Sequence, residues 1–383
     1  MNFEFMTSEQ IIFGIGAINQ IGELSRSLGS KVLIICGGGS VDLEILVSQM
    51  KRFDVDYETF HVTKEPNIQT IEAGLALSKL TKCKFVIGFG GGSVIDAAKA
   101  IAVLMTNNGS LLDYLEVIGQ GKPITQKPAE VIAVPTTAGT GTEVTKNAVI
   151  SSPEHKLKVS LRSPMMIPKI ALVDPELSIS MPKAITASTG MDALTQLIEA
   201  YVSKRANPMT DSFIREGINR AARSLRIAYN QPENIKARED MSLASLFGGI
   251  ALANAGLGAV HGFAAVIGGM FDAPHGEVCA SLLPAVLHEN IAAIKETDQS
   301  SAYLVKISEI AKLLLQNEQA SNEDCIKILE ELKSEFEIRK LSDFGVTARD
   351  YPVIVENARK SSSMQKNPID LTEYRLYSIL YNS

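Results

Sequence analysis

The sequence predicts a chain of two domains, with an α/β first half built on a parallel sheet and an all-helical second half. The 383 residues exceed the size at which one hydrophobic core is usual, so two domains are expected. Short apolar runs alternate with amphipathic stretches up to about residue 175, which is typical of a parallel sheet. From Ile185 onward the apolar spacing is helical. We therefore divide the chain into domains 1–180 and 181–383.

The elements of the first half follow from the periodicity of its apolar residues. Continuous or alternating apolar runs predict strands at residues 31–36, 55–60, 85–88, 131–134 and 170–173. Helical spacing predicts helices at residues 41–53 and 68–80. After Val173 we find no run that predicts a strand, which is why the second half is expected to be helical throughout.

Composition argues against several classes of function. The net charge of −6 is spread along the chain without a Lys/Arg cluster, so a nucleic-acid partner is not expected. The four cysteines lie far apart and form no Cys-x-x-Cys pair, which fits a reducing compartment better than a disulfide framework. Neither a signal peptide nor an apolar membrane span is evident. We expect a cytoplasmic protein without a membrane partner.

A glycine-rich turn between a predicted strand and helix is the first candidate ligand site. Gly90, Gly91 and Gly92 lead into a helix that we expect to open at Ser93. Glycines let the backbone approach a phosphate, and the N–H groups and dipole of a helix start favour an anion. The Ser93 hydroxyl could cap the helix or donate to a phosphate oxygen. The spacing matches no strict nucleotide motif, so a tight turn is the alternative, but three adjacent glycines exceed what a turn needs.

A second polar loop, residues 135–143, follows the strand at 131–134. Thr136, Thr137 and Thr140 stand there with two glycines, and their hydroxyl and amide groups could bind the same diphosphate. The alternative is a hydroxyl-rich turn with local hydrogen bonds. Two donor-rich loops in one α/β domain suit a dinucleotide better than a single phosphate.

A third glycine cluster, Gly37-Gly38-Gly39-Ser40, ends the first strand, where the adenosine ribose of a dinucleotide would be placed in such a sheet. A carboxylate at that place would favour NAD over NADP, and Asp42 lies just beyond it. No Lys or Arg stands nearby to favour NADP. The sequence leaves the choice between NAD and NADP open.

The second half carries a candidate metal site. Two of only five histidines, His261 and His275, stand 14 residues apart, each followed by a glycine. Asp192 precedes them on a predicted helix. One carboxylate and two imidazoles form a typical ligand set for a divalent metal. The alternative is a pair of helix-capping or hydrogen-bonded core histidines.

These motifs together resemble the iron-containing (group III) alcohol dehydrogenase family, in its dehydroquinate-synthase-like superfamily. The resemblance covers nearly the whole chain. Its motifs, in order, are Glu65-Pro66-Asn67, Gly90-Gly91-Gly92-Ser93-x-x-Asp96-x-x-Lys99, the loop 135–143, Lys158, Asp174-Pro175-Glu176-Leu177, Gly190-Met191-Asp192-Ala193-Leu194-Thr195, His261-Gly262, Pro274-His275-Gly276-Glu277 and Ser362-Ser363-Met364-Gln365-Lys366-Asn367-Pro368.

The resemblance implies a Rossmann-like dinucleotide-binding domain followed by an all-α domain, with cofactor and metal meeting in the cleft between them. It implies NAD or NADP as cofactor, Fe²⁺ or Zn²⁺ as metal, and a homodimer or larger homo-oligomer. The cofactor contacts that it implies are Asn67, Gly91, Gly92, Ser93, Thr136, Thr137, Thr140, Lys158 and Leu177, to which the glycine clusters add Gly37, Gly38 and Gly90. The metal positions that it implies are Asp192, Gln196, His261 and His275.

Two departures from the family pattern bear on this site. Gln196 stands where the family usually has a histidine, one helical turn after Asp192. Its amide oxygen could reach the same ion, but it is a weaker donor than imidazole toward Zn²⁺ or Fe²⁺. Related glycerol dehydrogenases resemble a three-ligand design, so Asp192 and the two histidines could suffice. Ala265 stands where several members carry a histidine thought to relay the proton.

The function implied is an NAD(P)-dependent alcohol dehydrogenase or aldehyde reductase, with metal-assisted hydride transfer between a small alcohol and its aldehyde or ketone. Catalysis would depend on Asp192, His261 and His275 through the bound metal. The main alternative is a metal-free, NAD(P)-dependent oxo-acid reductase resembling maleylacetate reductase, against which the presence of Asp192 counts. A non-redox enzyme resembling dehydroquinate synthase and a non-catalytic dinucleotide-binding protein are further alternatives.

Overall fold

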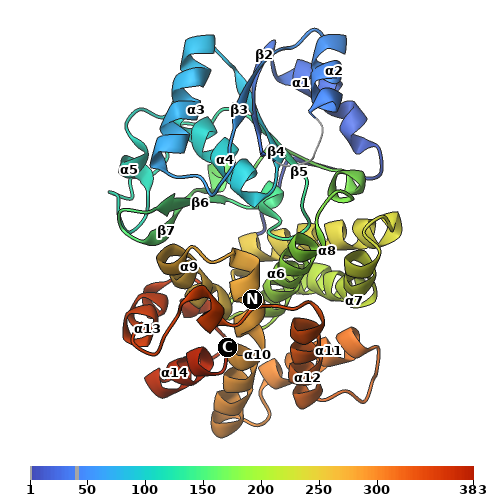
Figure 1. The fold of residues 1–383 in the computed structure, drawn as a ribbon, viewed down its shortest axis with the longest axis vertical. Coiled ribbons are helices and arrows are strands. Elements are labelled where there is room, and N and C mark those ends of the chain that lie inside the picture. Colours follow the sequence, from blue (N-terminus) through green and yellow to red (C-terminus); the bar gives the residue numbers. More distant parts are fainter. Residues whose placement is uncertain (1, 39–42) are drawn as a thin grey trace. The chain divides into compact units, whose positions relative to one another are not determined.

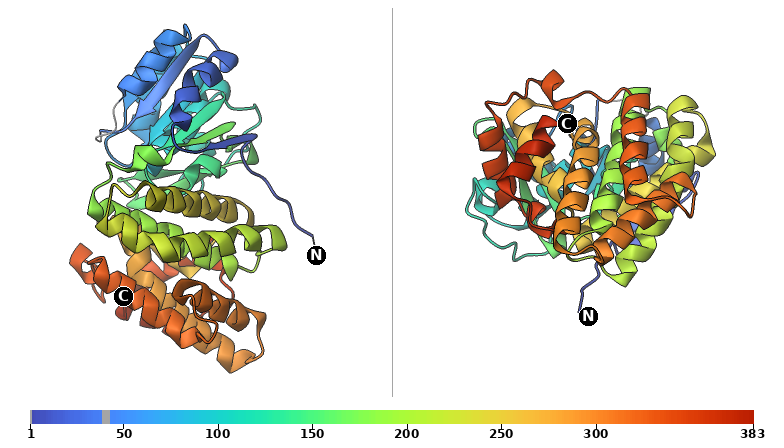
Figure 2. Two further views of the ribbon diagram at one scale, coloured as in Figure 1. Left: turned by 90° about the vertical axis from the view of Figure 1, so that its right-hand side faces the viewer. Right: turned by 90° about the horizontal axis from the view of Figure 1, so that it is seen from below.

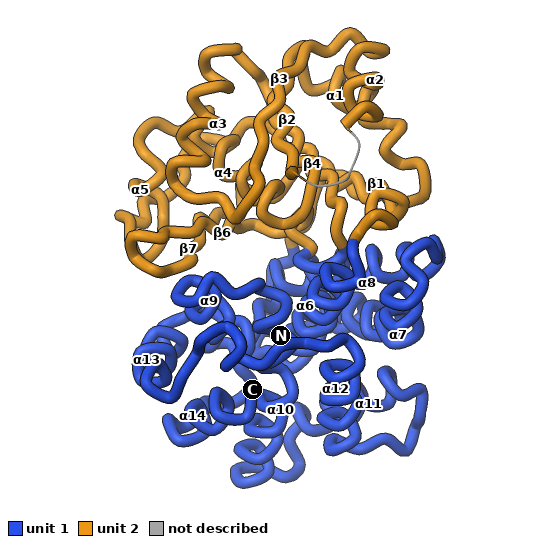
Figure 3. The backbone as a smooth tube through the Cα atoms, viewed as in Figure 1, with its two compact units in different colours: residues 1–5, 138–140, 182–383 blue, residues 6–137, 141–181 orange. Residues whose placement is uncertain are grey.

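A computed structural model describes residues 2–38 and 43–383. The chain divides into two compact units, shown in two colours in Figure 3. Unit 1 comprises residues 1–5, 138–140 and 182–383, and unit 2 comprises residues 6–137 and 141–181. Unit 2 contains the sheets and unit 1 contains the long helices of the second half. The predicted α/β and all-helical halves are confirmed, whereas the division into domains 1–180 and 181–383 stays a prediction.

Unit 2 is built on a parallel sheet of six strands in the order β1-β8-β5-β4-β2-β3. The strands are β1 (Gln10–Phe13), β2 (Lys31–Cys36), β3 (Asp56–His61), β4 (Phe85–Gly90), β5 (Val131–Pro135) and β8 (Ile170–Val173). A separate antiparallel pair is formed by β6 (Asn147–Ser152) and β7 (Leu157–Arg162).

Helices cover both faces of this sheet (Figure 1). Val32 and Ile34 of β2 pack into one core, and Leu33 and Ile35 pack into the other, because successive side chains of a strand point to opposite faces. A sheet covered on both faces explains the continuous apolar runs of its strands. The covering helices are α1 (Ile21–Leu28), α2 (Glu44–Arg52), α3 (Ile68–Thr81), α4 (Gly92–Thr106) and the short α5 (Leu111–Tyr114).

The order of the strands creates a switch point between β2 and β4. The chain runs outward from β2 to β3 on one side, while β4 and β5 continue the sheet on the other side. In open α/β sheets, ligands bind at the carboxyl ends of the strands beside such a point. The loops after β2, β4 and β5 leave from that edge, since Cys36 pairs with Phe89 and Gly90 pairs with Pro135.

The structure contains three strands that the periodicity did not predict. β1 has only four residues, and its partner β8 lies about 160 residues away in the chain, so no local signal marks it. The hairpin of β6 and β7 does carry a local signal. Buried residues alternate along both strands, which is the pattern of half-buried strands. The predicted helix 41–53 is observed as Glu44–Arg52, and residues 39–42 lie outside the described residues.

The helix after the glycine-rich turn begins one residue earlier than predicted. Gly91 is the N-cap residue of α4, whose first residue is Gly92, and no side-chain cap is formed. The prediction that the helix opens at Ser93 was therefore wrong, and its hydroxyl is not the N-cap.

The glycine at position 88 is needed for packing, because a Cβ there would lie 3.2 Å from the Cα of Ile95. This close approach seats α4 on β4.

A buried lysine fastens α4 to the segment that follows β5. The Lys99 ammonium donates to Thr142, Thr145 and the carbonyl oxygen of Asn147, and it lies 3.2 Å from a carboxylate oxygen of Asp96. The Lys99 side chain is fully buried. A buried cation is tolerated only when it is paired and hydrogen-bonded in this way. The sequence motif that contains Asp96 and Lys99 is thus a structural clamp.

We predict that Lys99→Met strongly destabilises the protein, because it removes the cation that balances the buried Asp96 carboxylate and the donor that several buried acceptors share. Breaking a buried ion pair by removing one partner costs about 3–5 kcal/mol of the free energy of unfolding. The matched control, Lys79→Met at an exposed position of α3, should change it by no more than about 0.5 kcal/mol. Urea denaturation measures both, and equal midpoints for Lys99→Met and the wild type would contradict the clamp.

Unit 1 consists of helices, in which α10 contacts α6, α9, α12 and α14, while α7 and α8 pack on α6 and on each other (Figures 1 and 2). Its helices are α6 (Lys183–Tyr201), α7 (Pro208–Asn230), α8 (Ile235–Ala255), α9 (Ala259–Phe271), α10 (His275–Thr297), α11 (Ala302–Leu315), α12 (Asn322–Glu335), α13 (Tyr351–Lys360) and α14 (Glu373–Tyr381). Among the described residues, α10 has the length and composition of a membrane span, as does the pair of α8 and α9, bent by 101°. However, 78% of the apolar window of α10 is buried inside the fold, as in a core helix.

Candidate metal centre

One carboxylate and two imidazoles from three helices of unit 1 meet in a buried cluster. Asp192 lies in the middle of α6, His261 in the first turn of α9, and His275 is the first residue of α10. The Oδ1 atom of Asp192 lies 3.5 Å from Nε2 of His261 and 3.6 Å from Nε2 of His275. The structure thus brings together the three residues on which the predicted metal site depends.

A glycine contact explains why the start of α10 lies against α6. A Cβ at Gly276 would come within 2.3 Å of the Ser188 carbonyl oxygen and 3.4 Å of the Cβ of Asp192. Only glycine allows the two helices to approach so closely. This contact places His275, the residue before Gly276, beside Asp192.

The N-terminus of α9 is held by a buried carboxylate from α6. The carboxylate of Glu199 accepts hydrogen bonds from the backbone N–H of Val260 at 2.6 Å and of His261 at 3.3 Å. Oδ1 of Asn367 accepts from the N–H of Ala259. A negative charge at a helix N-terminus is favourable because the free N–H groups and the helix dipole are positive there. Glu199 and Asn367 therefore fix where α9 begins, and with it His261.

Glu199 also fixes the orientation of the His261 ring. Nδ1 of His261 lies 2.7 Å from Oε2 of Glu199. A carboxylate accepts, so Nδ1 carries a proton, and Nε2 is the ring nitrogen that faces Asp192 and could bind a metal. Carboxylate–histidine pairs of this kind orient metal-binding imidazoles.

Gln196 lies one turn after Asp192 and is hydrogen-bonded to it. Its Nε2 atom is 3.3 Å from Oδ2 of Asp192 and 3.3 Å from the carbonyl oxygen of Gly139. Both neighbours are acceptors, which fixes the amide with its nitrogen toward them. The amide oxygen of Gln196 is buried without a hydrogen-bond partner.

Cys279 joins the cluster, although the sequence reasoning did not select it. Its Sγ atom lies 3.6 Å from Nε2 of His275 and 3.8 Å from Nε2 of His261. One ligand atom each of Asp192, His261, His275 and Cys279 lie within 4.8 Å of one another. Position 279 is four residues after His275, and Glu199 is seven after Asp192. Helical spacing from the predicted ligands is thus the sequence signal that could have revealed both.

The electrostatics of the cluster favour a positive charge at its centre. Burial opposes the charge of Asp192, but His275 and His261 outweigh it and lower the pKa of Asp192. Burial also opposes the charge of His261, but its neighbours Cys279, Asp192 and Glu199 raise the pKa of His261 well above its usual value. The Oδ1 atom of Asp192 is buried without a hydrogen-bond partner. Such an atom pointing at two imidazole nitrogens fits a cation, because a buried carboxylate oxygen is costly to leave unpaired.

The predicted cofactor residues of unit 2 lie mostly at the carboxyl ends of its parallel strands. Gly37 and Gly38 follow β2, Gly90–Ser93 lie at the end of β4 and the start of α4, Thr136 and Thr137 follow β5, and Leu177 lies after β8. Asn67 caps α3 through its side chain. Thr140 belongs to unit 1. Gly39, Ser40 and Asp42, which bear on the choice between NAD and NADP, lie outside the described residues.

Lys158 on β7 lies close to the cap of α3. Its ammonium is 2.6 Å from Oε1 of Glu65, and its strand neighbour Ser151 forms a bridge with Asn67. The Lys158 side chain is nearly buried, with 6% of its area exposed. Asn67 and Lys158, two of the implied cofactor residues, therefore both lie beside Ser151 in unit 2.

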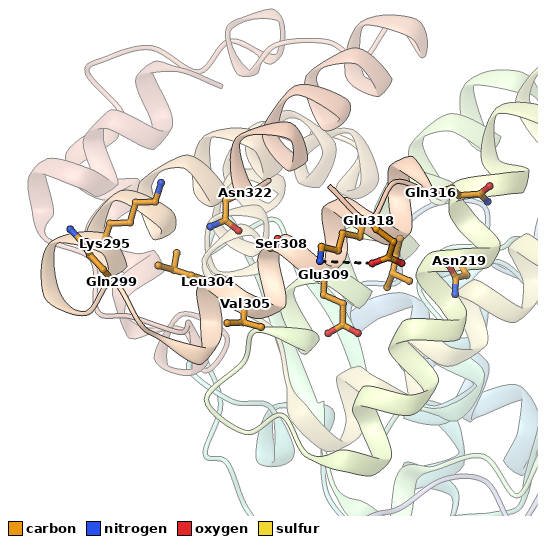
Figure 4. A pocket seen from close by; sticks show the side chains of 12 residues that line it. Asn219, Lys295, Gln299, Leu304, Val305, Ser308, Glu309, Gln316, Glu318 and Asn322 are labelled. Carbon is orange, nitrogen blue, oxygen red and sulfur yellow. Dashed lines mark ion pairs between the residues drawn. The ribbon is translucent and has the colours of Figure 1, made fainter. Parts of the chain in front are cut away.

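A groove of about 1140 Å³ elsewhere in unit 1 contains none of the predicted site residues (Figure 4). It lies among α7, α10, α11 and α12, and its side chains include Lys295, Glu309, Lys312 and Glu318. Lys312 and Glu318 pair with each other, and Glu309 binds Arg215. His155 and His288 are exposed and lie outside the metal cluster.

Comparison with known proteins identifies the family. The model of the iron-containing alcohol dehydrogenases matches residues 8–175, and the model of the C-terminal part of the same family matches residues 186–383. The chain belongs to the iron-containing alcohol dehydrogenase family. It is 34% identical to 1,3-propanediol dehydrogenase of Klebsiella pneumoniae, over 98% of this chain and 97% of the relative. It is 35% identical to alcohol dehydrogenase 4 of Saccharomyces cerevisiae, over 96% and 95%.

Solved structures agree with this assignment. A crystal structure of 1,3-propanediol oxidoreductase has a TM-score of 0.92 at 33% identity, with 100% of this chain and 99% of that chain covered. The alcohol dehydrogenase of Oenococcus oeni has a TM-score of 0.90 at 32% identity, with 99% of each chain covered. The predicted fold class and the predicted activity are confirmed: the chain is an alcohol dehydrogenase, an oxidoreductase acting on CH–OH groups. The family uses NAD(P) and iron or another divalent metal.

We predict that Glu199→Gln weakens metal binding while the ligands stay in place. The amide removes the negative charge that caps α9, and it no longer fixes the proton on Nδ1 of His261. Loss of such an orienting partner typically costs 10–100-fold in metal affinity. Competition with a chromogenic chelator measures the Kd for Zn²⁺. Glu233→Gln, at an exposed position in the same unit, is the matched control and should leave the Kd unchanged. Equal dissociation constants for Glu199→Gln and the wild type would remove this role.

Proposed function

We propose that this enzyme transfers hydride between a small alcohol and the oxidised nicotinamide of NAD or NADP, with a divalent metal held by Asp192, His261 and His275. The observation that carries the proposal is the buried Oδ1 atom of Asp192, which has no hydrogen-bond partner and faces Nε2 of both histidines. A divalent cation there supplies Lewis-acid polarisation of the alcohol or carbonyl oxygen.

The protein residues divide the work of holding that ion. Asp192 contributes the negative charge, and the two imidazoles contribute neutral nitrogen ligands from separate helices. Glu199 keeps the proton of His261 on Nδ1, so that Nε2 is free to bind. Gln196 donates to Oδ2 of Asp192 and thereby turns Oδ1 toward the histidines. We propose this orienting role for Gln196, with coordination through its amide oxygen as the alternative.

For the cofactor, we propose that the loops at the carboxyl ends of the parallel strands bind its phosphates. The N-terminus of α4 presents free N–H groups and a positive dipole to an anion, and Gly91 at the N-cap carries no side chain to block it. Thr136 and Thr137 follow the neighbouring strand and add hydroxyl donors. Lys158 adds a positive charge that Glu65 partly neutralises.

The substrate is proposed to be a small alcohol. Relatives over nearly the whole chain include a 1,3-propanediol dehydrogenase and an NAD-dependent methanol dehydrogenase, both named for small alcohols. Ala265 on α9 offers no titratable group, so we propose that the alcohol proton leaves through water or a cofactor hydroxyl. We further propose a cytoplasmic homodimer or larger homo-oligomer, without nucleic-acid or membrane partners.

A metal-free oxo-acid reductase is the second candidate. Gln196 in place of the usual family histidine favours it, since the site then has one imidazole fewer. The unpartnered Oδ1 atom of Asp192 argues against it, because an oxo-acid substrate would add a second negative charge beside this carboxylate.

We predict that His261→Ala and His275→Ala each lower kcat/KM at least ~100-fold with small alcohols, because each removes a metal ligand. Binding of NAD(P)H, followed by fluorescence titration, should persist in both variants, since the proposed cofactor loops are untouched. His288→Ala is the matched control, because this histidine is exposed on the same helix as His275. Near-normal turnover in either ligand variant would refute the metal mechanism and leave the oxo-acid reductase as the better proposal.

A further inference from the structure

Cys279 occupies a position from which its sulfur can bind the same ion as Asp192 and the two histidines. It lies one helical turn after His275 on α10, so both side chains leave the same face of the helix. Cys279 is fully buried, and Nε2 of both histidines lies within 3.8 Å of its Sγ atom. The other described cysteines, Cys36, Cys83 and Cys325, belong to no such group.

Four of the six separations within this group are close to the edges of a coordination tetrahedron. An ion bound at about 2.0 Å to nitrogen or oxygen and about 2.3 Å to sulfur has N···O edges of about 3.3 Å and N···S edges of about 3.5 Å. The corresponding distances are 3.5 and 3.6 Å from Asp192 Oδ1 to the histidines, and 3.6 and 3.8 Å from Cys279 Sγ to the histidines. Along these four edges the atoms need to move only a few tenths of an ångström to coordinate one ion, to which the substrate oxygen would add as a fifth ligand.

Gln196 is less well placed than Cys279 to be the fourth ligand of the ion. Its amide nitrogen faces the Oδ2 atom of Asp192 and the carbonyl oxygen of Gly139, both of them acceptors. Its amide oxygen is buried and makes no hydrogen bond to either histidine. Cys279 already lies next to both imidazoles.

Charge also favours the sulfur ligand. A thiolate adds a negative charge to that of Asp192 and so strengthens the attraction for a divalent cation, which is screened little in a buried site. The thiol proton passes to solvent when the metal binds, as is usual for cysteine ligands.

We propose that Cys279 is the fourth protein ligand of the metal, and that the resulting Asp–His–His–Cys set selects Zn²⁺ or a similar thiophilic ion over Fe²⁺. The inference rests on the proposed function, because it concerns the same metal centre. Thiolate is a softer ligand than imidazole or amide, and soft ligands shift preference toward Zn²⁺. The chain thus replaces the histidine missing at position 196 with a ligand from a different helix.

Cobalt spectroscopy of the full-length protein tests the assignment without relying on activity. Metal-stripped protein is loaded with Co²⁺, and the near-ultraviolet spectrum is recorded for a thiolate-to-cobalt charge-transfer band. The wild type should show the band, Cys279→Ser should lose it, and Gln196→Ala should keep it. Cys325→Ser, which changes another fully buried cysteine, is the matched control and should also keep it.

Zn²⁺ binding supplies two further readouts. Cys279→Ser should lower the affinity for Zn²⁺ at least ~10-fold, since even orienting partners of metal ligands contribute that much. X-ray absorption of the Zn²⁺-loaded wild type should show a sulfur neighbour at about 2.3 Å. This measurement needs no variant, so it decides the question even where Cys279→Ser fails to fold.

The outcomes separate this inference from the proposed function. Co²⁺ retained by the wild type without a thiolate band, or with a band that survives Cys279→Ser, would overturn the role of Cys279 and leave the metal centre intact. Failure of the wild type to retain Co²⁺ or Zn²⁺ at all would overturn the metal centre and, with it, the proposed function.

Discussion

The proposed metal centre depends on one buried carboxylate oxygen that faces two imidazole nitrogens. Asp192 can hold this position only because three helices meet around it. Glycine at 276 lets α10 touch the backbone of α6 at Ser188, and the Glu199 carboxylate fixes the first turn of α9. Asp192 and Glu199 lie seven residues apart on α6 and have different roles. Asp192 faces the cluster, and Glu199 orients one of its histidines. Without either helix contact, the oxygen of Asp192 would be a buried charge without a partner, which a protein rarely tolerates.

The glycines that follow the two histidines have a physical explanation in packing. In the sequence, the His-Gly pairs indicate the family, but the sequence alone does not explain why a glycine follows each histidine. In the structure, a Cβ at Gly276 would collide with the Ser188 carbonyl oxygen, and a Cβ at Gly262 would press on Ser361 and Met364 at 3.0–3.2 Å. Each glycine therefore brings its helix close to a neighbour and carries the adjacent histidine into place. In each His-Gly pair, the histidine is the proposed ligand and the glycine allows the close helix contact that positions it.

Much of the fold was predictable because its signals are local. Buried strands such as β2 and β4 are continuous apolar runs, and the predicted ligands Asp192, His261 and His275 do come together. The misses have physical causes. β1 pairs with a strand about 160 residues away, so nothing nearby marks it. Cys279 and Glu199 carry no motif of their own, and their roles appear only when a helical turn is counted from a known ligand. The start of α4 was misplaced by one residue because glycine, unlike serine, caps a helix without a side-chain hydrogen bond.

The most direct test of the central claim is a metal titration of alcohol oxidation by metal-stripped protein. NAD(P)H formation from a small alcohol is followed at 340 nm (roughly the absorbance maximum of the reduced nicotinamide), while elemental analysis gives the bound Zn²⁺ or Fe²⁺. We predict that the stripped protein is inactive and that the rate rises in proportion to bound metal, reaching its plateau at about one ion per chain. Full turnover before any metal is added would contradict the account.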